Sequence, residues 1–193
     1  MQRTLRCVVC AVALMATAAC AGGEEIDDAN AASGPRPERA RFKNLVVSGR
    51  DVREVDLNGD SQPDQWYIQA GSTVVRVERD LNFDGRPDAY EYPDASGQPV
   101  EEEMDLDVDG IIDVVNYYNG GLLTRKELST DFTGRIAVVK FYDTEGELSR
   151  IERDSDNDGK VDVWEYYQSK RKIRTGRDVD GDGAPDVFDD VDS

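Results

Sequence analysis

The stretch DLDVDGIID occupies residues 105–113, and related nine-residue stretches recur along the chain. An acid or an amide stands at the first, third, fifth and ninth places of each intact copy, and glycine usually stands sixth. The start-to-start spacing of 24 or 25 residues predicts a repeat architecture in which each unit packs on its neighbours. The intact copies are DLNGDSQPD from Asp56, DLNFDGRPD from Asp80, DLDVDGIID from Asp105, DSDNDGKVD from Asp154 and DVDGDGAPD from Asp178, and a degenerate copy, STDFTGRIA, begins at Ser129.

The residues between the loops alternate as they do in strands. Apolar or aromatic residues stand two and four places after each of the first five loops, which puts each pair on one face of a strand. Turn signals such as Ser96–Gly97 and Gly120–Gly121 follow, and a second alternating stretch leads into the next loop. We therefore predict an all-β fold, a meander or solenoid of strand, turn, strand and loop. The pairs are Trp66 and Ile68, Tyr90 and Tyr92, Val115 and Tyr117, Val139 and Phe141, and Trp164 and Tyr166.

These alternating pairs have two interpretations. The first is a narrow core in which the pairs stack unit upon unit, and the second is an aromatic platform for carbohydrate. The core is favoured because the pairs stay in phase with the repeat.

The loops have the chemistry of a calcium site. Calcium takes 6 to 8 oxygen ligands, mostly from carboxylates, amides, carbonyls and water. Glycine at the sixth place permits the left-handed backbone of a sharp turn. We predict four or five calcium ions. The candidate ligands are Asp56, Asn58, Asp60 and Asp64; Asp80, Asn82, Asp84 and Asp88; Asp105, Asp107, Asp109 and Asp113; Asp154, Asp156, Asp158 and Asp162; and Asp178, Asp180, Asp182 and Asp186.

The six loops are not equal. Ser61 replaces the glycine of the first loop, which predicts weaker binding there, and the loop from Ser129 is predicted to bind no ion. The alternative to metal is neutralisation by the arginines that precede the loops. Those arginines are Arg53, Arg79, Arg125, Arg153 and Arg177.

The loops resemble the calcium loop of EF-hands, and two of them continue to the acid at its twelfth place, Glu91 and Glu165. They resemble more closely the shorter DxDxDGxxD loops of thrombospondin type 3 and related bacterial repeats, because the flanks alternate like strands. The twelfth residue then lies on the other face of the strand, about 10 Å along it. This position argues against Glu91 and Glu165 as ligands, and the sequence leaves their role open.

The N-terminal segment has the pattern of an export signal. Arg3 and Arg6 precede an uncharged apolar stretch that ends in Thr17, Ala18, Ala19 and Cys20. This ending resembles the lipobox of bacterial lipoproteins, which implies acylation of Cys20; an ordinary signal peptide is the alternative. The predicted organisation is a signal peptide at 1–19, a lipidated cysteine and flexible tether at 20–41, and a six-unit repeat domain at 42–193. We expect an exported lipoprotein of the cell envelope, attached to the outer membrane.

Composition narrows the classes of function. The chain has 41 acidic and 23 basic residues and a net charge of −18, which excludes nucleic acid as a partner. It has no histidine and no nucleophile motif, so we expect a structural or adhesive binding module rather than an enzyme. The partner would be an unidentified protein or polysaccharide. The alternatives are a dockerin-like protein, which needs helices after the loops, and a carboxylate-pair glycan hydrolase.

Overall fold

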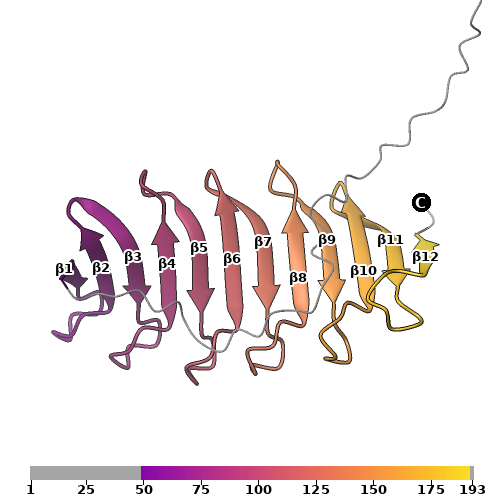
Figure 1. Ribbon diagram of the computed structural model, residues 1–193. Coiled ribbons are helices and arrows are strands. Elements are labelled where there is room, and N and C mark those ends of the chain that lie inside the picture. The colour runs from indigo at the N-terminus through magenta and orange to yellow at the C-terminus, as the bar shows by residue number, and fades with distance from the viewer. Residues whose placement is uncertain (1–48, 192–193) are drawn as a thin grey trace, which may run out of the picture. The chain divides into compact units, whose positions relative to one another are not determined.

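A computed structural model describes residues 49–191, which form one antiparallel sheet of twelve strands in sequence order (Figure 1). The predicted all-β fold is confirmed, and the sheet is an open meander. The strands are β1 (Asp51–Val55), β2 (Gln65–Ala70), β3 (Thr73–Arg79), β4 (Ala89–Pro93), β5 (Pro99–Met104), β6 (Val114–Asn119), β7 (Leu122–Leu128), β8 (Val138–Tyr142), β9 (Leu148–Arg153), β10 (Val163–Gln168), β11 (Arg171–Arg177) and β12 (Val187–Asp190).

The predictions for the N-terminal segment lie outside the described residues. They comprise the signal peptide at 1–19, the lipidation of Cys20, the tether to residue 41 and the first residues of the repeat domain, 42–48. Within residues 49–191 no helix is long and apolar enough to cross a membrane.

The two kinds of connection lie at opposite ends of the strands. The six nine-residue loops all lie at one end of the strands, and the short turns lie at the other end (Figure 1). This follows from the strict alternation of loop and turn in a meander, because every second strand runs in the same direction. The sheet therefore gathers loops that are far apart in the sequence into one row.

Backbone hydrogen bonds join this row of loops. The ninth residue of each loop donates its N–H to the residue just before that loop, as Asp113 does to Met104 over 2.8 Å. The first residue of each later loop donates to the ninth residue of the loop before it, as Asp105 does to Asp88 over 2.8 Å. Each loop is thus fixed at both ends to the ladder of the sheet and to its neighbour.

The core differs from the predicted stacking of apolar residues unit upon unit. Residues two places after successive loops are separated by an intervening strand, which presents glutamate in β3, β5, β7 and β9 and Gly176 in β11. Glu103 lies opposite Tyr90 on one side and Val115 on the other. The row alternates because each repeat contributes two strands, so that equivalent residues of successive repeats lie two strands apart. The row is Trp66, Glu78, Tyr90, Glu103, Val115, Glu127, Val139, Glu152 and Trp164.

Arginines on the same face balance the buried glutamates. The side chain of Glu127 is 2% exposed, and its Oε1 lies 2.5 Å from a guanidinium nitrogen of Arg125. Arg150 and Glu152 form a similar pair at 3.1 Å, and the Arg150 guanidinium lies 4.3 Å from the centre of the Phe141 ring. Buried carboxylates are stable only when they are paired or hydrogen-bonded. The residues of the alternating pairs are mostly buried or half-buried, which favours the core interpretation.

Candidate metal centre

The backbone of each loop turns through the left-handed region twice. The sixth residue has a positive φ, as expected for Gly85, Gly110 and Gly159, and Ser61 adopts the same conformation with a φ of 73°. The fourth residue is also left-handed, although it is Phe83 in the second loop and Val108 in the third. Such a φ is uncommon for a β-branched residue and is retained only where the surrounding structure imposes it. Sequence reasoning found the sixth position and missed the fourth, where only Gly59, Asn157 and Gly181 gave a signal.

The first aspartate of the loop holds this double turn together. In the third loop the Oδ1 of Asp105 accepts the N–H of Val108 over 2.7 Å, and its Oδ2 accepts the N–H of Gly110 over 2.6 Å. Asp56 and Asp178 accept the corresponding pairs of N–H groups in the first and last loops. The N–H groups of the two left-handed residues thus converge on one carboxylate.

The ninth aspartate closes the loop from the other side. The Oδ2 of Asp113 accepts the N–H of Leu106 over 2.7 Å, and Asp88 accepts that of Leu81 over 2.9 Å. In each case one carboxylate oxygen is used by the loop itself. The other oxygen remains available for a ligand.

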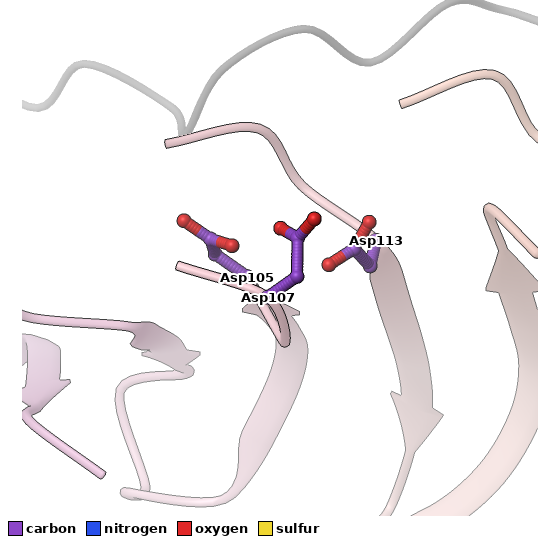
Figure 2. Close-up of side chains that lie close together, drawn as sticks. All are labelled: Asp105, Asp107 and Asp113. Atoms are coloured by element: carbon purple, nitrogen blue, oxygen red, sulfur yellow. The ribbon is translucent and has the colours of Figure 1, made fainter. Parts of the chain in front are cut away.

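Carboxylates of the first, third and ninth places come together in three loops. In each group one ligand oxygen from every residue lies within 4.8 Å of the others, and each group can hold a metal ion. Figure 2 shows the carboxyl groups of the third loop side by side, with Asp113 at the start of its strand. The groups are Asp105, Asp107 and Asp113; Asp154, Asp156 and Asp162; and Asp178, Asp180 and Asp186.

Two oxygens in these groups are buried and accept no hydrogen bond. They are the Oδ1 atoms of Asp113 and Asp154, in residues that are 0% and 3% exposed. Burial raises the pKa of the Asp113 carboxyl, and the negative charges of Asp107 and Asp105 raise it further, against the lowering effect of the Leu106 and Asp107 N–H groups. A buried carboxylate oxygen without a donor is unfavourable unless a cation balances it.

The acid at the fifth place of the loop lies outside the groups formed by the first, third and ninth acids. Asp109, Asp158 and Asp182 were predicted ligands, but they are not members of the three groups. Each instead accepts the N–H of the seventh residue over 2.8 Å. The first two loops carry Asn58 and Asn82 at the third place, so an amide stands where the three groups have a carboxylate.

The five arginines before the loops interact with the sheet. Arg79 lies 2.6 Å from Glu91, and Arg153 lies 3.2 Å from Glu165. The twelfth-place glutamates, which belong to β4 and β10, are thus held in ion pairs with these arginines. Arg125 and Arg177 pair with Glu127 and Asp189, and Arg53 lies over the Tyr67 ring. These contacts argue against the arginines as the counterions of the loop aspartates.

Basic side chains also connect one loop with the next. From the seventh place of the degenerate loop, Arg135 donates to the carbonyl of Asn157 over 2.6 Å. Lys160 occupies the same place in the next loop and donates to the carbonyl of Gly181. Sequence reasoning missed these contacts, because only the sheet brings together residues of neighbouring loops that are 21 or 22 positions apart.

No protein-family model and no curated protein matches the chain. Among solved structures, a chain of the glycosylation-associated Gap123 complex from Streptococcus agalactiae has 15% identity and a TM-score of 0.39, with 48% of this chain and 18% of that chain covered. A chain of a GtfA/B complex bound to UDP and GlcNAc has 11% identity and a TM-score of 0.36, with 73% of this chain and 27% of that chain covered. TarM has 16% identity and a TM-score of 0.37, with 63% of this chain and 20% of that chain covered. This chain therefore spans about a quarter or less of those chains.

These similarities correct one prediction. From the sequence we expected a protein that is not an enzyme, but TarM and GtfA/B are proteins of glycosyltransferase type, and that expectation is withdrawn. With TM-scores below 0.4 they assign no activity to this chain either.

Proposed function

We propose that the repeat domain is a calcium-binding module that the cell displays on its envelope, attached through a lipid on Cys20. One observation carries the metal site: buried Oδ1 atoms of Asp113 and Asp154 that accept no hydrogen bond, each within a group of three carboxylates. A cation bound there would balance the negative charges of the three neighbouring carboxylates.

The donor set favours calcium among the common metals. The loops offer carboxylate and amide oxygens, and the chain has no histidine, so the softer nitrogen ligands that suit zinc and copper are missing. Magnesium needs near-ideal octahedral geometry and keeps several waters. Calcium accepts irregular sets of oxygens and binds to exported modules with Kd values of about 10⁻⁴ to 10⁻³ M.

Calcium would act on the fold through the loops. Asp105 already organises the left-handed residues, and an ion shared with Asp107 and Asp113 would fix both ends of the loop at once. A ligand that binds only the folded state stabilises it by RT ln(1 + [L]/Kd). The module would then stiffen at the calcium concentrations outside the cell, and bind a protein or a polysaccharide in that state.

Isothermal titration calorimetry tests the proposal. The wild-type chain should bind four or five calcium ions, Asp156→Ala should bind one fewer, and Asp131→Ala should match the wild type because its loop has lost the ligands. A stoichiometry of zero or one would contradict the proposal. Magnesium titrated in the same way should give a much weaker response.

The attachment has its own test. Cys20→Ser should release the protein from the membrane fraction, and a variant that remains with the membrane would rule out the lipid anchor. A pull-down with the tagged protein, with calcium and with chelator, would then identify the partner.

A further inference from the structure

The two end strands of the sheet differ from the strands between them. Four residues of β1 and all four of β12 are exposed, including Val52 at 42%, Val187 at 46% and Phe188 at 46%. Each pairs with one neighbouring strand among residues 49–191. An exposed edge with apolar side chains is a template for a further strand.

The register inside the sheet predicts what that strand can be. Wherever a short turn joins two strands, the first residue after one loop lies opposite the last residue before the next loop, as Gln65 lies opposite Arg79 and Val163 opposite Arg177. All five turn-connected pairs obey this rule. β12 begins just after a loop and β1 ends just before one. Val187 of β12 and Val55 of β1 therefore occupy the two positions that face each other in such a pair.

Applied to β12 of one copy and β1 of another, the rule gives a complementary contact. Val187 would lie opposite Val55. On the same face Asp189, which pairs with Arg177 of its own copy over 2.8 Å, would lie opposite a second arginine, Arg53. On the other face Phe188 would lie opposite Glu54, which repeats the arrangement of Trp66 and Glu78 inside the sheet. Opposite charges and apolar pairs at directly facing positions stabilise antiparallel strands.

We propose that the protein self-associates head to tail, with β12 of one copy adding to β1 of the next. The loops of successive copies would continue one row, and the N–H of Asp56 would reach the Asp186 carbonyl as Asp178 reaches Asp162 over 2.9 Å. Such a contact does not close on itself and gives linear chains.

Disulfide trapping tests this contact on the full chain with Cys7, Cys10 and Cys20 changed to serine. Val55→Cys with Val187→Cys places two thiols at a non-hydrogen-bonded pair, where the Cα atoms of antiparallel strands are about 4.5 Å apart. Within one copy these positions are separated by eleven strand spacings, about 50 Å, so any disulfide joins two copies.

In calcium, mild oxidation should convert most of this variant into dimers and longer chains on a non-reducing gel. Glu54→Cys with Val187→Cys is the matched control, because the two side chains lie on opposite faces, and it should lose the cross-linked bands. A folded Val55→Cys, Val187→Cys variant that stays monomeric would overturn the proposal, as would equal cross-linking of the control.

Charge reversal provides a second measurement. In sedimentation velocity, Asp189→Arg should shift the chain to monomer, and adding Arg53→Asp should restore association. Loss of association without restoration in the double variant would also overturn the proposed register. Neither experiment depends on how many calcium ions bind, so the result is separate from the calorimetric test above.

Discussion

The loop at 105–113 and the loop at 129–137 have the same shape with different chemistry. Gly134 donates to the Ser129 Oγ over 3.0 Å, as Gly110 donates to Asp105, and the fourth residue, Phe132, is left-handed like Val108. The ninth residue is Ala137 instead of Asp113. A hydroxyl is therefore enough to hold the turn, and the additional carboxylates of the intact loop are more than the backbone needs.

The eighth residues explain why both loops keep their shape. Ile112 and Ile136 are each 0% exposed, and Ile136 packs in a cluster with Val139 and Phe141. Each of the two loops is thus anchored by the buried isoleucine at its eighth place and by backbone hydrogen bonds at both of its ends. The degenerate loop, which lacks the ninth carboxylate, is an internal reference for the other five.

The largest effect should come from removing calcium. Chelator should lower the thermal midpoint strongly, because each intact loop loses about 2.7 kcal/mol of stabilisation when calcium had exceeded its Kd about a hundredfold. Differential scanning calorimetry of the wild type with calcium and with chelator measures this. Equal midpoints in the two conditions would mean that the intact loops are as independent of metal as the loop at 129–137.

Converting the intact loop at 105–113 into the degenerate one should lower the stability of the protein in calcium and raise it in chelator. Asp105→Ser with Asp113→Ala removes two buried carboxylates, so the variant should be less stable than the wild type in calcium by about 1 to 3 kcal/mol. In chelator it should be more stable, because the repulsion is gone. Urea unfolding in both conditions checks this, with Asp131→Ala as the control, and a variant destabilised equally in both would point to lost packing instead.

The opposite conversion should create a site. Ser129→Asp, Thr133→Asp and Ala137→Asp supply the first, fifth and ninth acids beside the existing Asp131, in a loop whose backbone already has both left-handed residues. Calorimetry should then count one additional calcium ion. An unchanged count would show that carboxylates on this backbone are insufficient for binding.

The smallest effect concerns the twelfth place. Burial raises the pKa of the Glu165 carboxyl, but hydrogen bonds from Lys172 and Arg153 outweigh it and hold the pKa below 4.5. A depressed pKa in the folded state contributes stability above the ordinary pKa, and this is lost as the pH falls through the folded value.

Glu165→Gln should therefore cost stability near about pH 6, and its difference from the wild type should shrink towards about pH 3. Urea unfolding across this range measures the difference in free energy of unfolding between the variant and the wild type. The loop aspartates titrate in both proteins, so their contribution cancels in this difference. The calcium count should not change. A variant that binds one ion fewer would make Glu165 a ligand after all.

The sequence alone determined the strands, the turns and the phase of the loops. Period-two residues such as Trp66 and Ile68, the turn glycines and the fixed spacing are local signals, because a strand needs only alternation and a turn needs only permissive φ values. The grouping of the first, third and ninth acids was predictable for the same reason: Asp105, Asp107 and Asp113 lie within nine residues, and a sharp turn brings them together.

Only the tertiary structure decided which side chains meet across strands. The glutamate between successive apolar residues, the pairing of Arg79 with Glu91 and the contact of Arg135 with the next loop all join residues brought together by the register of the sheet. The burial of Asp113 belongs to the same class, because the adjoining strands and loops remove it from water. Cross-strand register and burial depend on the whole sheet, and no stretch of nine residues contains them.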